Sequence, residues 1–289
     1  MPAVSVVVPC YNGGRFIAQL LGCLRAQTFQ NFEIIIVDDG STEPETRRVL
    51  DGLDPSIRVV RQENRGMSGA RNTGFREARA ELVFPLDCDD TIGETFIGEA
   101  VRLLRAAPPE YAFAFSHLRL AGAEDVIPRH FNPFDILFSN GMPSGMVMRK
   151  IAWETVGGYD EGFREGYEDW EFNIRLARFG FRGIEIPEPL YIYHLTREGM
   201  LLSRSTQMHA ALWRRIRKKH APLYRLPALL RLWRVSGGEV SLVRALGTLA
   251  MTAVLPDRWF NALIARQRLR RFERGLISRP PLTPEAQKP

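Results

Sequence analysis

Short apolar runs alternate with stretches of helical periodicity over residues 1–90. The runs are rich in β-branched residues and apolar almost throughout, which is typical of strands buried on both faces of a parallel sheet. Strands and helices therefore follow one another as repeated βα units. The predicted strands are residues 4–8, 32–37, 57–61 and 82–86, and the predicted helices are residues 15–26 and 68–79.

The pattern becomes less regular beyond residue 90. An irregular stretch containing Pro and Phe extends to Asn140, and Pro187 and Pro189 confine a turn between two short strands. One helix has acidic residues at its start, which suits a helix N-terminus. The predicted elements are a helix over residues 94–105, a strand over 141–149, a helix over 168–179, and strands over 181–186 and 190–194.

From Gln207 onward the chain is rich in Arg, Leu and Trp, with proline and glycine breaks that leave room for three or four helices. The last segment holds four prolines and little that could pack, so we expect disorder there. We expect three parts: an α/β domain over residues 1–203, a basic, amphipathic helical module over 204–277, and a disordered tail over 278–289.

Composition is ordinary for a globular protein with a core, with 45% hydrophobic and 25% charged residues in 289. The three cysteines form no disulfide framework and the first residues resemble no export signal, so we expect a cytoplasmic protein. Charge is uneven: residues 1–203 carry a net −8, and residues 204–279 a net +14. Such a basic segment indicates an anionic partner, either a lipid surface or a nucleic acid.

Acidic residues follow two of the predicted strands. Asp38 and Asp39 end the second strand, where side chains of an open parallel sheet reach a bound nucleotide. The alternative is that they only begin a turn and cap the next helix. Asp87, Asp89 and Asp90 follow the fourth strand, and their mutual repulsion favours a bound Mg²⁺ or Mn²⁺. The alternative there is a solvated turn in which Asp90 caps the following helix.

Three further positions are chemical candidates. Glu168 and Asp169 open a predicted helix, where a carboxylate stays ionised and accepts a proton, although simple helix capping is the plainer interpretation. His194 ends a strand; a lone histidine is normally structural and gains weight only beside a metal site. Arg71 lies where it could meet phosphate, and a surface-exposed arginine is the alternative.

In this order the segments resemble the motif series of family 2 glycosyltransferases. Six or more motifs over residues 3–195 are far more specific than one match. The matching segments are Val7-Val8-Pro9-Cys10-Tyr11-Asn12, Val37-Asp38-Asp39-Gly40-Ser41, Asn64-Arg65-Gly66, Ala70-Arg71-Asn72, Asp87-Cys88-Asp89-Asp90, Gly157-Gly158-Tyr159-Asp160 and Glu168-Asp169.

The resemblance implies a GT-A fold, a nucleotide-binding αβα sandwich with a mixed, mainly parallel sheet. It also implies Mn²⁺ or Mg²⁺ as cofactor and inverting transfer of a sugar from a nucleotide diphosphate, with UDP the default nucleotide ahead of GDP and dTDP. Asp169 is then the general base and Glu168 helps to place the acceptor, a glycan or lipid-linked molecule. Metal ligands are expected at Asp87, Asp89 and His194, and donor-binding residues at Pro9, Tyr11, Asn12, Asp38, Asp39, Arg71, Asp87 and Cys88.

The chain departs from the processive synthases of that family. Their glutamine/arginine/tryptophan motif and multiple membrane spans are absent, which suggests transfer of one sugar per acceptor encounter. The C-terminal segment matches no motif, but Leu246, Leu249, Ala250 and Ala253 have amphipathic spacing, and tryptophans are interspersed with basic residues. We therefore expect peripheral attachment at the inner face of the cell membrane rather than nucleic acid binding, with ordinary helix packing as the alternative.

Two other functions use a similar domain. A nucleotidyltransferase would carry a Gly-rich basic loop after the first strand, but the segment Asn12-Gly13-Gly14-Arg15 is too short for that, and no GxGxxG motif indicates an oxidoreductase. A non-catalytic sugar or nucleotide binding protein is the third alternative. The presence of Asp89, Asp169 and His194 together argues against it.

Overall fold

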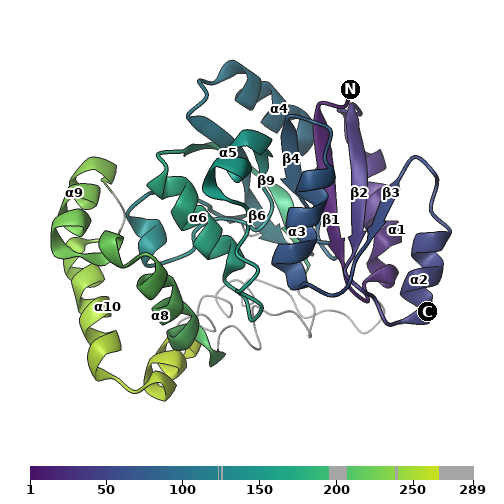
Figure 1. Cartoon of the computed structure of the whole chain (residues 1–289). Helices are drawn as coiled ribbons and strands as arrows, with labels where there is room; N and C mark the ends of the chain where they lie inside the picture. The colour runs from purple at the N-terminus through teal and green to yellow at the C-terminus, as the bar shows by residue number, and fades with distance from the viewer. Residues whose placement is uncertain (123, 125, 195–206, 238–239, 267–289) are drawn as a thin grey trace.

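The computed structural model describes residues 1–122, 124, 126–194, 207–237 and 240–266. Its centre is a nine-stranded sheet in the order β3-β2-β1-β4-β8-β6-β9-β5, with β7 paired to β6 (Figure 1). Strands β1 to β4 are parallel, whereas β8 is antiparallel to both β4 and β6. The predicted mixed, mainly parallel sheet is therefore confirmed.

The parallel half consists of the βα units that the apolar runs predict. Each predicted strand is present within one or two residues at either end, but helix α2 is absent from the prediction because its short, charged sequence gives little apolar signal. The elements are β1 (Val4–Cys10), α1 (Gly14–Arg25), β2 (Phe32–Asp38), α2 (Pro44–Asp51), β3 (Arg58–Arg61), α3 (Gly66–Glu77) and β4 (Leu82–Pro85).

The second half of the sheet is mixed and is interrupted by irregular segments. The elements are β5 (Thr91–Ile92), α4 (Phe96–Ala106), β6 (Tyr111–Leu120), β7 (Val126–Ile127), η1 (Asp135–Leu137), β8 (Val147–Arg149), α5 (Lys150–Val156), α6 (Glu168–Arg178) and β9 (Arg182–Tyr193).

Two predictions for this half are wrong. Residues 182–193 form one strand rather than two, because β9 follows β6 throughout and accommodates both prolines in a bulge where the register shifts. The stretch expected to be irregular contains β6, which pairs with both β8 and β9. Because β6 is buried on both faces over most of its length, it shows no alternation of apolar and polar residues.

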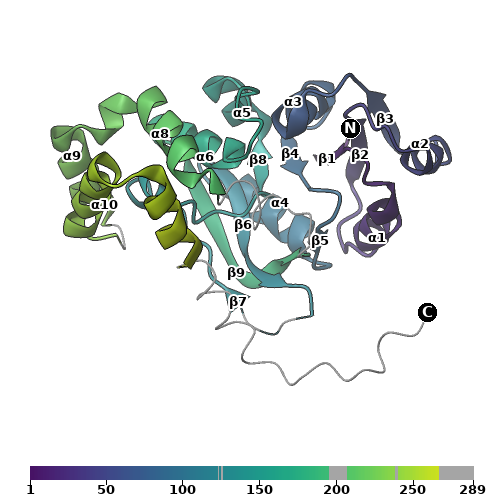
Figure 2. The same ribbon diagram turned by 90° about the horizontal axis from the view of Figure 1, so that it is seen from below.

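Helices cover both faces of the sheet, with the sheet lying between α1 and α3 in the view of Figure 2. Val6 and Val8 of β1 face a core formed with α1 and α4, whereas Val7 faces a second core formed with α3, α5 and α6. This alternation along β1 follows from the two-residue period of a strand. The result is a three-layer sandwich whose parallel strands all end at one edge.

The basic module packs against the second core. Trp213, Ile216 and Phe260 are buried in that core together with α6 residues, and the Trp213 indole donates a hydrogen bond to the Leu137 carbonyl (3.0 Å). Its elements are α8 (His209–Lys219), η2 (Ala221–Tyr224), α9 (Leu226–Ser236), α10 (Leu242–Val254) and helical residues 257–266.

Two of the predicted boundaries cannot be placed in this fold. The boundary at residues 203 and 204 and the tail over 278–289 both lie outside the described residues. Within the described part of the chain, no helix combines the length and apolar character needed to cross a bilayer.

Candidate active site

The carboxyl ends of β1, β2 and β4 meet at one edge of the sheet. Cys10 pairs in register with Asp38, and the Leu86 amide donates to the Val7 carbonyl (2.9 Å), so the loops after the three strands are neighbours. Pro9 is buried within β1, whereas Tyr11 in the loop is 50% exposed. The structure therefore brings the predicted donor residues of these loops together, with Tyr11 open to a ligand.

Asn12 and Asp38 shape the loops themselves. The Asn12 side chain accepts hydrogen bonds from the Thr42 and Glu43 amides (2.8 and 3.0 Å), and its φ of +52° turns the chain out of β1. The Asp38 carboxylate accepts from the Ser41 amide (2.9 Å). For Asp38 the turn interpretation is thus observed, and any contact with a nucleotide would be additional to it.

Asp39 holds the Asn64-Arg65-Gly66 loop. Its two carboxylate oxygens accept hydrogen bonds from the Arg65 and Gly66 amides, each at 2.8 Å, and from the Gln62 side chain. Gly40 permits this approach, because its φ is +75° and a Cβ there would lie 2.9 Å from the Asn64 nitrogen. Asp39 therefore fixes the polar loop that begins α3.

Arg71 is the residue that joins the two acidic clusters. It is 1% exposed; its Nη2 atom lies 2.7 Å from Asp87 Oδ1, and its Nη1 atom lies 3.0 Å from Glu168 Oε1. The Nε atom is buried without a hydrogen-bond partner. The alternative of a surface-exposed arginine is wrong, because α3 directs this side chain into the protein between two carboxylates.

The cluster after β4 contains more negative charge than its neighbours neutralise. Burial and the charge of Asp87 raise the pKa of Asp89, and the same two causes raise the pKa of Asp90 well above its usual range. The Cys88 side chain lies against that of Cys10 under Gly13, where a Cβ would come within 2.7 Å of the Cys88 sulfur. An added cation would relieve the repulsion among these aspartates.

Asp90 has a structural role that sequence reasoning missed. It accepts hydrogen bonds from the Tyr191 hydroxyl (2.7 Å) and from the His194 amide (3.1 Å), so it ties the loop after β4 to the end of β9. The alternative in which Asp90 caps the next helix is wrong, since α4 begins at Phe96 with Thr95 as its N-cap residue.

His194 lies beside the acidic cluster. Its Nε2 atom is 2.9 Å from the Thr91 hydroxyl and 3.3 Å from the Gln19 side-chain nitrogen. Partial burial lowers the pKa of His194, which favours the neutral ring that binds metals. With Nε2 in these contacts, metal binding would use Nδ1 or a rotated ring. Among the described residues, no group of three or more His, Cys, Asp and Glu side chains forms a preassembled metal site.

Glu168 and Asp169 begin α6 on the other side of Arg71. Burial raises the pKa of Glu168 to about 7, although the Arg71 charge opposes that shift. Burial also raises the pKa of Asp169, although the Arg71 charge and the hydrogen bond from the Trp170 amide oppose that shift. Glu168 bonds to Arg71, and the N-cap residue Tyr167 makes no side-chain cap. The Asp169 carboxylate accepts a hydrogen bond from an amide of the first helical turn, so the capping interpretation applies in part to Asp169 but does not explain the bond between Glu168 and Arg71.

Asn140, which no sequence motif singles out, orients Asp169. Its side-chain amide donates to Asp169 Oδ2 (2.9 Å), while the Trp170 amide donates to Asp169 Oδ1 (2.7 Å). The Asn173 side-chain amide in turn donates to the side-chain oxygen of Asn140, Oδ1, at 3.3 Å. Each carboxylate oxygen keeps a second lone pair, so Asp169 can still accept a proton.

Asn72 organises the glycine-rich segment before α6. Its side-chain oxygen, Oδ1, accepts hydrogen bonds from the Trp153 indole (3.1 Å) and the Tyr159 backbone amide (2.8 Å). Its side-chain nitrogen, Nδ2, donates to the Tyr159 carbonyl (2.9 Å). Gly158, with a φ of +72°, lies against Asn72 where a Cβ would approach to 2.8 Å. Adjacent residues of α3 thus bind two parts of the site, Arg71 the carboxylates and Asn72 this loop.

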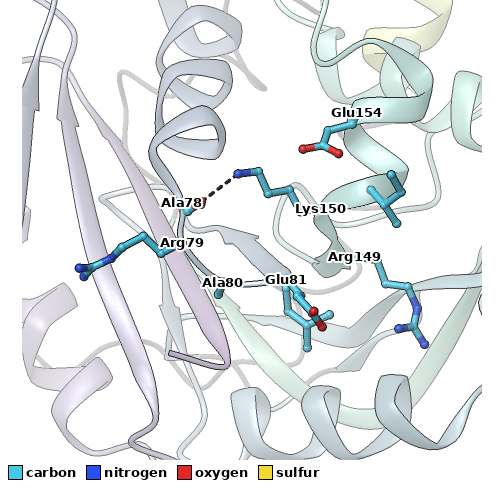
Figure 3. A pocket seen from close by; sticks show the side chains of 9 residues that line it. Ala78, Arg79, Ala80, Glu81, Arg149, Lys150 and Glu154 are labelled. Atoms are coloured by element: carbon cyan, nitrogen blue, oxygen red, sulfur yellow. Dashed lines mark hydrogen bonds between the residues drawn. The ribbon is translucent and has the colours of Figure 1, made fainter. Parts of the chain in front are cut away.

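A surface pocket at the opposite edge of the sheet is a poor candidate for the same chemistry. It lies where α3 ends and β4 begins, and Figure 3 shows Lys150 extending toward the Ala78 carbonyl, to which it donates at 2.8 Å. Arg149 donates to the Leu104 and Ala107 carbonyls. Because these cations already bond to carbonyl groups, the pocket offers little to an anionic ligand.

The family described as Glycosyl transferase family 2 matches residues 5–179. The putative glycosyltransferase EpsH of Bacillus subtilis (strain 168) is 39% identical over 214 residues, which are 67% of this chain and 61% of EpsH. The chain spans between about a quarter and three fifths of the length of the curated relatives it matches first.

Two solved structures share the fold. S. aureus TarS 1-349 in complex with UDP-GlcNAc has a TM-score of 0.60 and 21% identity, covering 75% of this chain and 65% of that one. The mannosyltransferase PcManGT of Pyrobaculum calidifontis, in complex with GDP-Man and Mn²⁺, has a TM-score of 0.56 and 23% identity, covering 91% of this chain and 84% of that one. At these identities the likeness concerns the fold.

Proposed function

The chain belongs to glycosyl transferase family 2, and from this membership we propose that it transfers a single sugar, with inversion, from a nucleotide diphosphate to a saccharide or lipid-linked acceptor. One observation carries the proposal. Arg71 bonds to Asp87 in one acidic cluster and to Glu168, next to Asp169, in the other. Groups suited to a leaving diphosphate and to an attacking hydroxyl are thus neighbours, although they are far apart in the sequence.

On the acceptor side, Asp169 serves as the general base. It takes the proton of the acceptor hydroxyl as that oxygen bonds to the anomeric carbon and the bond from that carbon to the diphosphate oxygen breaks. Attack from the face opposite the leaving group inverts the configuration. The raised pKa of Asp169 makes it a stronger base than an exposed aspartate, and Asn140 keeps the carboxylate oriented.

On the donor side, Asp87 and Asp89 would hold a Mn²⁺ or Mg²⁺ ion, with His194 as a third ligand. Their carboxylate oxygens are the ligands that these ions prefer, and the raised pKa of Asp89 indicates negative charge that a cation would offset. When bound, the ion stabilises the negative charge of the departing diphosphate. Arg71 fixes Asp87, and Tyr11 offers an exposed ring to the nucleotide.

The nucleotide and the acceptor are the finer parts of the proposal. We assign UDP as the nucleotide, as the resemblance to the family implies, with GDP as its main rival; the two compared structures hold UDP-GlcNAc and GDP-Man. The acceptor belongs to surface glycan synthesis, and the enzyme works peripherally at the inner face of the cell membrane. The net charge of +14 over residues 204–279 supports this location.

A thermal-shift panel tests the donor site directly. UDP-, GDP- and dTDP-sugars are added to the full chain with Mn²⁺ or with EDTA, for wild type, Asp89→Asn and the exposed control Asp54→Asn. A donor at 100 times its Kd adds about 2.7 kcal/mol to the free energy of unfolding. We expect wild type and Asp54→Asn to show this shift with UDP-sugars and Mn²⁺ only.

Asp89→Asn should fold but lose the metal-dependent shift. A donor shift that neither EDTA nor Asp89→Asn alters would contradict the metal site. Shifts with GDP-sugars in place of UDP-sugars would correct the nucleotide. Where a donor binds, the anomeric configuration and the number of sugars added per acceptor, read by NMR and mass spectrometry, test inversion and single transfer.

A further inference from the structure

Exposed apolar side chains are concentrated on the C-terminal helices. Most of the large hydrophobic residues that are exposed lie between residues 226 and 263, and Val235, Val243 and Val254 are each more than 80% exposed. Helices α9 and α10 form the end of the molecule farthest from β3 and α2 in both views (Figures 1 and 2). This end therefore presents apolar surface to its surroundings.

Helix α10 is apolar on both of its faces. Ala245 is buried and Leu249 packs against the core, whereas Val243 and Val254, about three turns apart, are exposed on the other side, and Leu246 is 38% exposed between the two faces. Its single charged residue is Arg244. A surface helix of a globular protein ordinarily has a polar outer face, so this outer face is suited to contact with an apolar phase.

Basic residues accompany the exposed apolar residues along these helices. Arg225, Arg231, Arg234, Arg244, Arg258 and Arg266 are all exposed. Among the described residues from 225 to 266 the one acidic residue is Asp257, which forms an ion pair with Arg214. Trp233 and Trp259 are exposed as well, at 36% and 60%. Arginine and tryptophan alongside an apolar strip suit the headgroup region of an anionic bilayer.

Other occupants fit this composition less well. A nucleic acid would match the arginines but would leave the apolar strip without a partner. A second copy across a twofold axis would cover the strip but would place the same arginines opposite one another. Helix α10 has 13 residues and is too short to span a membrane, so contact would lie along the surface.

We propose that the outer faces of α9 and α10, together with Trp259, dock on an anionic lipid bilayer. The apolar side chains enter the boundary between headgroups and acyl chains, and the accompanying arginines contact lipid phosphates. This inference rests on the proposed location of sugar transfer beside a membrane, and it identifies the surface that makes the contact.

The test measures binding of the full chain to vesicles, without donor or acceptor. Vesicles of phosphatidylcholine with about 30% anionic phosphatidylglycerol are compared with vesicles of phosphatidylcholine alone. The double variant Val243→Gln/Val254→Gln should bind anionic vesicles roughly tenfold more weakly. The matched control Ile151→Gln/Val126→Gln changes two exposed apolar residues elsewhere and should bind like wild type.

Two further readouts check the geometry. Arg231→Gln/Arg234→Gln should weaken binding by about fivefold for each arginine. Added salt should also weaken the binding of wild type to anionic vesicles. Lipids brominated near the headgroup should quench part of the tryptophan fluorescence. The quenched part comes from Trp233 and Trp259, because the other three tryptophans, Trp153, Trp170 and Trp213, are buried.

Specific results would overturn the proposal. One is failure of wild type to bind anionic vesicles, and another is equal vesicle binding by wild type and the Val243→Gln/Val254→Gln variant. Binding of wild type to duplex DNA but not to vesicles would also overturn it, as would a wild-type dimer that binds no vesicles and that the substitutions convert to a monomer. Because no sugar is transferred in the test, a protein that binds vesicles but transfers no sugar contradicts only the proposed activity. One that transfers sugar and ignores vesicles contradicts only the docking surface.

Discussion

Asp87, Asp89 and Asp90 follow a strand and repel one another, whereas Glu168 and Asp169 begin a helix, where Glu168 is buried against Arg71 and the half-buried Asp169 bonds to Asn140. In both clusters burial is the largest cause of the raised pKa values, but the charge of Asp87 is the second cause only in the first cluster. The first cluster is therefore suited to receiving a cation, and the second to receiving a proton. Arg71 contacts both and links the two roles.

The largest expected effect separates these roles. Asp169→Asn keeps the size of the side chain and one acceptor oxygen for the Trp170 amide but cannot take a proton, so kcat should fall by ~10²–10⁴-fold with donor binding unchanged. Initial rates and donor titrations measure the two quantities. Glu165→Gln, a partly exposed carboxyl of the preceding loop, is the control and should keep wild-type rates. Near wild-type turnover by Asp169→Asn would move the base to another residue.

The next prediction concerns the link itself. Arg71→Met leaves Asp87 and Glu168 without their shared cation in a buried site, which should lower the free energy of unfolding by about 3–5 kcal/mol. Arg58→Met removes an exposed ion pair with Glu77 and should cost at most about 1 kcal/mol. Urea unfolding measures both. Equal losses in the two variants would show that Arg71 holds neither cluster.

The parallel half of the fold could be predicted because its strands are continuous apolar runs. Val4 to Val8 and Phe32 to Val37 are buried on both faces, and the polar residues that follow them therefore lie at the same edge of the sheet. The acidic motifs of the donor side could be located in this way, since each follows its strand directly.

The second half could not be predicted, because its order depends on contacts between distant residues. The register of β6 and β9 is set by pairing across the sheet, and a proline in β9 has the same sequence signature as a turn. Asn140 lies in an irregular segment, and only the packing of η1 against α6 brings it to Asp169. For Arg71 a surface-exposed side chain stayed open as an alternative, because one helical turn of α3 gives no indication of which side chain enters the core.

A smaller effect tests the difference in protonation between the clusters. The pKa of Glu168 is raised from 4.5 to about 7, so its contribution to stability is fully present below pH 4.5 and is lost as the pH rises through about 7. Glu168→Gln should remove up to about 3 kcal/mol of that dependence. Urea unfolding between pH 5 and 8 measures it, with Glu165→Gln as control. Identical slopes in wild type and Glu168→Gln would assign the dependence to other groups.

The smallest effect concerns how the basic module supports the proton-accepting cluster. Tyr167 precedes Glu168 and has a φ of +68°, a backbone conformation that residues other than glycine rarely adopt. Its hydroxyl lies 2.6 Å from His209 Nδ1 of α8. Tyr167→Phe removes this hydrogen bond, and a loss of about 1 kcal/mol in the positioning of α6 should lower kcat about fivefold with donor affinity unchanged.

Tyr224→Phe is the matched control, because the Tyr224 hydroxyl also joins the module to the catalytic part, through the Leu137 carbonyl at 2.9 Å rather than through the residue that precedes the acidic pair. Both variants should lose similar stability, since each loses one hydrogen bond between the same two parts of the chain. Only Tyr167→Phe should lose turnover, because only Tyr167 adjoins the acidic pair. The first acidic cluster has no such contact with the module among the described residues, so donor affinity should be unchanged in both variants. Equal kcat values in the two variants would mean that the module stabilises the fold without positioning Asp169.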